Sequence, residues 1–191
     1  MENLSALLKN DEKCILFCSI EAEDAEFLME LNTDLDIAKC VVETPQIVML
    51  REQMQWPEKL KLEKNVKRFM VEHDGLSEGT VIVSSIDSLT LSAGINIKLH
   101  KSAYGKGIGK ASIMLALSYC FDTLELMCVT VHVLSYNRAL IALFKSCGFT
   151  NEETLRSRCV KMANGVIWSA FSSCETKLVD SSFGLRLFGG M

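Results

Sequence analysis

The stretch that decides the fold is LHKSAYGKGIGK, residues 99 to 110. It lies between a segment with strand character, Gly94 to His100, and an amphipathic segment from about Gly109 to Thr123. Three glycines at alternate positions let backbone N–H groups crowd around an anion. A helix that begins behind them adds unpaired N–H groups and the positive end of its dipole. The pattern therefore predicts a pyrophosphate site between a strand and a helix.

This turn differs from the two familiar nucleotide-binding motifs. A Walker loop needs Gly where this chain has Tyr104, and Ser or Thr where it has Ala111. The dinucleotide fingerprint needs its third Gly where this chain has Lys110, within an alternating series of strands and helices. A tight turn with a purely structural role is the alternative, and the turn by itself does not exclude it.

Upstream of the turn, the pattern predicts a meander of antiparallel strands. Period-two alternation begins at Lys67, Asp74-Gly75 supplies a turn, and Gly79 to Asp87 and Gly94 to His100 read as further strands.

Before the meander, the chain predicts a strand and two helices. The strand covers Cys14 to Ser19, the first helix covers Glu21 to Leu31, and Pro45 suits the first turn of the second helix.

Downstream of the turn, the pattern predicts a helix, a strand, a short helix and a hairpin. The strand covers Met127 to Leu134, the short helix opens at Asn137 and closes at Gly148, and Asn164-Gly165 joins the last two strands. We expect residues 1–180 to form a single domain, followed by a flexible tail at 181–191 that is rich in Ser and Gly.

The bulk composition excludes several classes of protein. The chain has 191 residues, 49% of them hydrophobic, with a net charge of −4, so we expect a globular protein without nucleic acid as a partner. Neither a signal peptide nor an apolar run of about 18 residues is present, which predicts a cytoplasmic protein with no membrane partner. None of the eight cysteines forms a CxxC pair, and we expect no metal.

A second motif, SYNRALIALFKSCGF at residues 135 to 149, follows the next predicted strand. Together the two motifs resemble the GNAT superfamily of acetyltransferases, in particular its RimJ/RimL branch. That branch has Arg-Gly-Lys-Gly-Tyr-Gly before the helix and Asn-x-x-Ala-x-x-Leu-Tyr-x-x-x-Gly-Phe after the next strand. The resemblance covers Gly94 to Phe149. It implies an α+β fold, with a central, mostly antiparallel, twisted sheet flanked by helices.

The resemblance also implies an N-acetyltransferase that uses acetyl-CoA. The strand at Ile97 to Leu99 would pair with the pantetheine arm, and the Leu99 N–H would polarise the thioester carbonyl. Asn137 would bind the cofactor or order its loop, although a helix N-cap is an equally compatible role. The residues implied around the pyrophosphate are Tyr104, Gly105, Lys106, Gly107, Ile108, Gly109 and Lys110.

Two positions depart from the family pattern. Tyr104 stands where the family has Arg or Gln, so one charged phosphate contact is lost. Phe144 stands beside the cofactor where the family has the Tyr that protonates the departing thiolate. Tyr136 or a water molecule could take over that role. The alternative is an acyl-CoA-binding module without catalysis.

Trp56 and Phe69 stand out on the acceptor side, which the resembling fold forms from its N-terminal helices and its final hairpin. Trp56 precedes a helix-breaking proline, and Phe69 lies on a strand that would line the cleft. Two aromatic faces can hold a flat ring between them. The alternative is that both are ordinary core aromatics.

Over its whole length, the chain further resembles the C-terminal acetyltransferase domain of the microcin C self-immunity family. That resemblance implies acetylation of the α-amino group of a processed aminoacyl nucleotide, an aminoacyl-adenylate analogue whose adenine Trp56 and Phe69 would clamp. It also implies a larger N-terminal domain before such a chain. The alternative acceptors are a protein N-terminus, a polyamine or an amino sugar.

No general base stands out in the sequence. Glu72, His73 and His100 are the candidates, and Ser169 occupies the hairpin position at which the family has an acidic residue. A chain of water molecules could deprotonate the amine instead.

Overall fold

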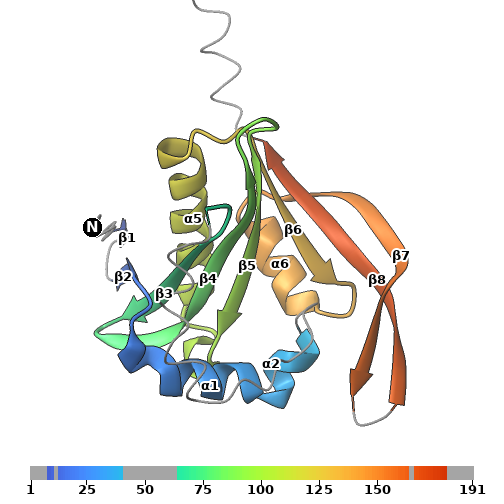
Figure 1. Cartoon of the computed structure of the whole chain (residues 1–191), viewed down its shortest axis with the longest axis horizontal. Coiled ribbons are helices and arrows are strands. Elements are labelled where there is room, and N and C mark those ends of the chain that lie inside the picture. The colour runs from blue at the N-terminus through green and yellow to red at the C-terminus, as the bar shows by residue number, and fades with distance from the viewer. Residues whose placement is uncertain (1–7, 11–12, 41–63, 164–165, 180–191) are drawn as a thin grey trace, which may run out of the picture.

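The computed structural model describes residues 8–10, 13–40, 64–163 and 166–179. They form one eight-stranded sheet in the order β1-β2-β3-β4-β5-β6-β8-β7 (Figure 1). The strands are β1 (Leu8–Asn10), β2 (Lys13–Cys18), β3 (Lys67–His73), β4 (Leu76–Asp87), β5 (Ser92–Leu99), β6 (Cys128–Leu134), β7 (Thr150–Ala163) and β8 (Val166–Val179). Every neighbouring pair is antiparallel except β5 and β6.

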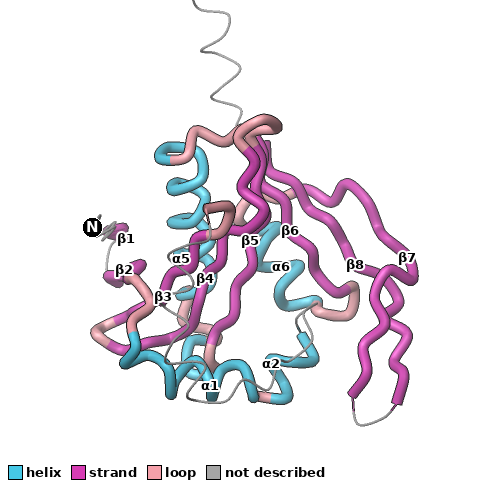
Figure 2. Tube along the Cα trace, viewed as in Figure 1, coloured by secondary structure: helices cyan, strands magenta, loops and turns pink. Residues whose placement is uncertain are grey.

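Helices pack against the sheet, and some of them lie across the ends of its strands (Figure 2). The α-helices are α1 (Ala25–Thr33), α2 (Leu35–Cys40), α5 (Ile108–Ser118) and α6 (Arg138–Ser146). Three shorter turns of helix join them: η1 (Ala22–Asp24), η2 (Lys101–Ala103) and the π-helical η3 (Tyr119–Thr123), which extends α5. In Figures 1 and 2, α1 and α2 lie at the end of the sheet toward which the β5 arrow points.

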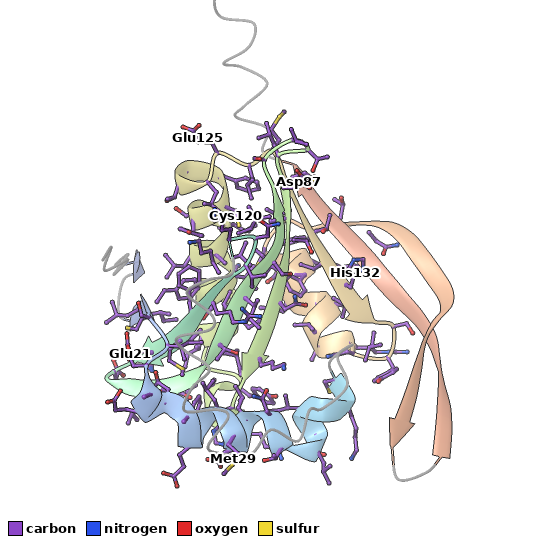
Figure 3. The ribbon with its side chains drawn as sticks, in the orientation of Figure 1. Glu21, Met29, Asp87, Cys120, Glu125 and His132 are labelled. Carbon is purple, nitrogen blue, oxygen red and sulfur yellow. The ribbon has the colours of Figure 1, made fainter. Side chains whose placement is uncertain are left out.

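The period-two pattern of β3 explains how the sheet is packed on both faces. Phe69 and Val71 belong to the main hydrophobic core, which they share with buried residues of α5 and α6. Met70, between them, points to the other face and packs with Ile20 and with Leu28 of α1. Side chains fill both layers, and Cys120 lies between the sheet and the end of α5 (Figure 3). The sheet is therefore sandwiched, with α5 and α6 on one face and α1 on the other.

The pairing of β5 with β6 is short, and it decides where a ligand can reach the sheet. The two strands pair in parallel only from Ser92 opposite Cys128 to Gly94 opposite Thr130. Beyond these residues they separate, as Figure 1 shows, while β5 stays paired with β4 as far as Leu99. The carboxyl half of β5 therefore has no strand partner on its β6 side among the residues that the structure describes.

The α+β fold with a mostly antiparallel sheet is confirmed, and so is the meander of β3, β4 and β5. The structure adds three features that the sequence pattern missed: strand β1, helix α2 and the parallel pairing of β5 with β6. The predicted second helix after Pro45, the turn at Asn164-Gly165 and the tail at 181–191 lie outside the described residues. In the described ranges, no helix has the length and apolar character needed to cross a membrane.

Candidate active site

The glycine-rich turn lies between η2 and the start of α5, as the sequence predicts. Gly105 and Gly107 have φ angles of +73° and +80°, in the left-handed region that side chains other than glycine rarely adopt. A Cβ atom added to either residue would find no atom of the described residues within 4 Å, so this part of the chain leaves the space in front of the backbone open. An open, glycine-lined backbone at a helix start is the environment that a pyrophosphate requires.

Gly109 is needed for a different reason, namely close packing. A Cβ atom at Gly109 would lie 3.2 Å from a methyl carbon of Leu143 in α6 and 3.2 Å from a methyl carbon of Leu99 in β5. The first turn of α5 is thus wedged between the helix and the strand that carry the rest of the expected site. Ile108 is fully buried beside it and anchors the turn to the core.

The first turn of α5 has backbone donors that the helix itself does not use. The first intrahelical bond runs from the Ala111 N–H to the carbonyl oxygen of Gly107 at 3.1 Å, so the N–H groups before Ala111 precede the ladder. Lys106 and Lys110 are exposed on either side of this turn. The donors and the two ammonium groups together can hold an anion of high charge.

Tyr104 does not replace the charged residue that the family has at this position. Its side chain is 59% exposed, and partial burial is the main cause that raises the pKa of its hydroxyl. The phenol is therefore neutral at neutral pH. It can contribute a hydrogen bond to a phosphate, but no charge.

The register of β4 and β5 decides which N–H groups of β5 face the separating strands. The His100 N–H donates to the carbonyl oxygen of Glu78 at 2.8 Å, in continuation of the β4–β5 register. Because bonding direction alternates along an antiparallel strand, Lys98 also faces β4, whereas Leu99 and Ile97 face the opposite side. The N–H groups of Ile97 and Leu99 therefore point toward the space between β5 and β6. The family resemblance implies that the pantetheine arm and the thioester lie in this space.

Tyr136 and Asn137 connect the loop after β6 to the end of α2. The Tyr136 hydroxyl donates to the carbonyl oxygen of Lys39 at 2.6 Å, and the Asn137 amide donates to the carbonyl oxygen of Cys40 at 3.3 Å. The Asn137 Oδ1 also accepts from the Leu140 N–H at 3.1 Å, so Asn137 is the N-cap of α6. Both side chains thus have a clear structural role. Their predicted catalytic roles stay predictions.

Two predicted site residues, Phe144 and Phe69, are buried in the core. Phe144 is only 3% exposed and packs edge-on against Phe149, with ring centroids 5.1 Å apart. Phe69 is 8% exposed and stacks on Phe17 at 5.1 Å, which favours its alternative as a core aromatic. Trp56 lies outside the described residues.

A polar cluster at the carboxyl end of β5 was not found from the sequence. Glu78 of β4 is 4% exposed, and its carboxylate accepts from the Ser102 hydroxyl. The Ser102 oxygen lies 3.0 Å from Nδ1 of His100, and Nε2 of the same ring lies 3.9 Å from a carboxylate oxygen of Glu30 in α1. Strand alternation alone would have placed Glu78 in the sheet, but it could not show which side chains it meets.

A second charged group ties η2 to α2. The Lys101 ammonium lies 3.4 Å from Asp34 and 2.8 Å from Asp36. These hydrogen bonds raise the pKa of Lys101, and Lys101 helps to lower the pKa of both acids. For Asp34, the larger causes are backbone N–H groups of Asp36 and Ile37. The turn before the glycines is thereby fixed to the end of α1 and the start of α2.

The other base candidates lie elsewhere. Glu72 lies beside Cys18, whose thiol pKa is raised to about 11 by burial and by this carboxylate, and His73 is buried beside Asp74 at 3.6 Å. Within the described part of the chain, no group of three or more His, Cys, Asp or Glu side chains could hold a metal ion.

Comparison with known proteins gives consistent matches. A family model described as "Acetyltransferase (GNAT) domain" matches residues 15–150. The spermidine N(1)-acetyltransferase of Escherichia coli K12 is 26% identical over 136 residues, which cover 71% of this chain and 73% of that protein. The Vibrio cholerae counterpart is 26% identical over 70% of this chain and 78% of its own length. The crystal structure of spermidine N-acetyltransferase from Vibrio cholerae in complex with CoA and spermine has a TM-score of 0.79 at 25% identity, covering 88% of this chain and 97% of that chain.

Proposed function

Because this chain belongs to the GNAT acetyltransferase family and is an acetyl-CoA-dependent N-acetyltransferase, we propose that its acceptor is a polyamine of the spermidine class. The curated relatives described above are spermidine acetyltransferases, and the V. cholerae structure contains CoA and spermine. They support the polyamine alternative rather than the aminoacyl nucleotide, the microcin C resemblance or RimJ/RimL specificity. They also give no support to a two-domain chain.

The observation that carries this proposal is the charge of the acceptor side. Every charged residue from position 21 to position 36 is acidic: Glu21, Glu23, Asp24, Glu26, Glu30, Asp34 and Asp36. This segment covers η1, α1 and the start of α2, at the end of the sheet toward which β5 points (Figure 1). A polyamine carries several ammonium groups, so the carboxylates from Glu21 to Glu30, which Lys101 does not pair, attract it and raise its local concentration.

The same charge disfavours the aminoacyl nucleotide. A nucleotide with a phosphate group brings negative charge to an acidic edge, and the like charges repel. The adenine clamp is also weakened, because Phe69 is buried in the core between Phe17 and Tyr119. Trp56 alone would offer one aromatic face.

The donor side has parts that fit acetyl-CoA. The open backbone at Gly105 and Gly107 would receive the pyrophosphate, and the N–H groups of Ile97 and Leu99 would pair with the pantetheine arm. When bound, acetyl-CoA supplies a thioester that an amine can attack. The Leu99 N–H would then face the charge that grows on the thioester oxygen.

A competition assay tests the acceptor. Spermidine, spermine, a peptide with a free N-terminus, glucosamine and an aminoacyl sulfamoyl adenosine are mixed at equal concentration with saturating acetyl-CoA, and each product is quantified by mass. We expect the two polyamines to be acetylated at least about 10-fold faster than the rest, with a preference that shrinks at high salt as the acidic edge is screened. Preferential acetylation of the sulfamoyl adenosine would instead restore the nucleotide as acceptor.

A further inference from the structure

Helix α2 crosses the opening between the ends of β5 and β6. The two strands separate after Gly94 and Thr130. Residues that follow β5 contact the start of α2, and residues that follow β6 contact its end. Six helical residues span about 9 Å, roughly twice the spacing of paired strands. Helix α2 therefore has the length needed to bridge two strands that have parted (Figure 1).

An ion pair holds the start of α2. Lys101 follows the end of β5, and its ammonium group lies 3.4 Å from Asp34 and 2.8 Å from Asp36. The Asp34 carboxylate also accepts from the N–H groups of Asp36 at 2.7 Å and Ile37 at 3.2 Å, so it caps the helix. A single lysine after β5 thus binds both the capping residue and the first turn of α2.

Two hydrogen bonds hold the other end of α2. The Tyr136 hydroxyl donates to the carbonyl oxygen of Lys39 at 2.6 Å, and the Asn137 amide donates to that of Cys40 at 3.3 Å. Both acceptors belong to the last turn of the helix, whose carbonyl groups have no partner within the helix. The loop after β6 thus supplies donors that the end of α2 needs.

The contacts at its two ends decide where α2 lies. A helix of six residues is too short to be stable by itself. Among the side chains of α2 that the structure describes, only Ile37 is buried, with 5% of its surface exposed. One buried side chain fixes a point of the helix but not its direction, so the ion pair and the two hydrogen bonds must fix the rest.

The residues that hold α2 come from the two loops that are expected to bind acetyl-CoA. Lys101 belongs to η2, which leads into the glycine turn, and Asn137 is the N-cap of α6. A ligand bound to both loops restricts their motion. Less conformational entropy is then lost when α2 is held in place, so a bound cofactor favours the ordered helix.

We propose that Lys101 and Tyr136 are positioning residues which, through α2, couple the binding of acetyl-CoA to the binding of the acceptor amine. Helix α2 continues the acceptor side that begins with α1, so the amine meets a complete surface only when α2 is in place. By reciprocity, the amine strengthens cofactor binding by the same factor. The proposal applies to any amine that contacts α2, and only the use of spermine as a probe rests on the proposed function.

Calorimetry measures this coupling. Spermine is titrated into the protein alone and into the protein saturated with CoA, which has no acetyl group and so permits no turnover. We expect CoA to raise the affinity for spermine about 5- to 10-fold, a modest coupling because the contacts that hold α2 are exposed. Equal affinity for spermine with and without CoA would overturn the proposal.

Two substitutions remove the contacts at either end of α2. Lys101→Met and Tyr136→Phe should each reduce the coupling to about 2-fold or less. Each should raise the KM of the amine and leave kcat almost unchanged, because neither residue is proposed to touch the reacting atoms. If Tyr136→Phe lowered kcat and left the coupling intact, the hydroxyl would act in the chemistry and its positioning role would be wrong.

The charge of the acceptor side is the competing explanation for an effect of Lys101→Met. Lys101→Met makes this side more negative and Asp36→Asn makes it less negative, yet both remove the same ion pair. An effect of charge alone would move the spermine affinity of the two variants in opposite directions and leave the coupling unchanged. Positioning predicts that both variants lose the coupling.

Lys39→Met is the matched control. The Lys39 ammonium lies 3.3 Å from the same Asp36, but this ion pair is internal to α2 and holds no other element. Lys39→Met should therefore keep the coupling, although it changes the charge by the same amount as Lys101→Met. An equal loss of coupling in the two lysine variants would assign the effect to charge and overturn the proposal.

Hydrogen exchange of residues 34 to 40 provides a readout that needs no amine. CoA should slow this exchange about 5-fold in the wild-type protein and in Lys39→Met, but not in Lys101→Met. If spermine failed to bind while CoA still protected α2, the polyamine proposal would be wrong and the positioning role would stand. Exchange in α2 that does not respond to CoA would overturn the positioning role, whichever amine is the acceptor.

Discussion

Replacing Gly107 with valine is expected to weaken coenzyme A binding by about 100-fold, or about 2.7 kcal/mol, as measured by calorimetry. Gly107 caps α5 with φ at +80°, a conformation that a β-branched residue strongly resists. The valine side chain would also fill the open space in front of the turn. Since a hydrogen bond to a charged group contributes about 1.5 to 3 kcal/mol, losing one or two backbone donors accounts for the effect.

Gly75→Val is the matched control for this substitution. Gly75 lies in the turn between β3 and β4, also with a positive φ, +75°, and with open space around its Cβ position. Both variants should lose a similar stability, about 1 to 3 kcal/mol, from backbone strain. Only Gly107→Val should lose CoA affinity. Equal CoA affinity in the two variants would show that the turn does not hold the pyrophosphate.

Replacing Leu99 with proline should lower kcat by about 10²- to 10³-fold, the cost of losing one donor to a developing oxyanion. Proline has no N–H, and the Leu99 N–H points away from β4, so the ladder between the two strands keeps its hydrogen bonds. Steady-state kinetics with saturating amine and acetyl-CoA would measure the effect.

Leu99→Ala separates the backbone donor from the packing of the side chain. The alanine variant keeps the N–H but loses the contacts that Leu99 makes with the core. It should therefore lose stability, measured by thermal unfolding, while retaining most of kcat. A proline variant that is as active as the alanine variant would exclude the Leu99 N–H as the oxyanion donor.

The sequence predicted those parts of the site that depend only on residues close together in the chain. The glycines of residues 105 to 109 need only their own backbone geometry and the helix behind them, and both are found where the spacing predicts them. Asn137 was predicted with two compatible roles, and the N-cap is the one that its contacts display. Alternating apolar residues were likewise sufficient to predict β3, β4 and β5 as a meander.

The parts that the sequence could not predict depend on contacts between distant residues. Tyr136 reaches the carbonyl of Lys39, 97 positions away, and no periodicity encodes such a pair. The sequence pattern predicts Glu78 only as a strand residue. It does not predict that this carboxylate is buried and accepts a hydrogen bond from Ser102 near the end of β5.

The position of an aromatic side chain likewise depends on contacts that the sequence pattern does not show. Phe69 was expected in a clamp because of its strand, but side-chain direction within the strand places it against Phe17 and Tyr119. Burial of an aromatic ring offers a large gain in free energy, so an aromatic residue that can reach the core usually does so. The acceptor side is therefore better characterised by its charge than by its aromatic residues.

Amide hydrogen exchange, resolved by residue with NMR, tests most directly whether acetyl-CoA binds along β5 and in the glycine turn. Without ligand, the N–H of Lys98 should already be protected by β4, while those of Ile97 and Leu99 exchange quickly. Saturation with CoA should slow exchange at Ile97 and Leu99 and across residues 105 to 110, and leave Lys98 nearly unchanged. Protection that appears elsewhere on the molecule, with Ile97, Leu99 and the turn unaffected, would contradict the account.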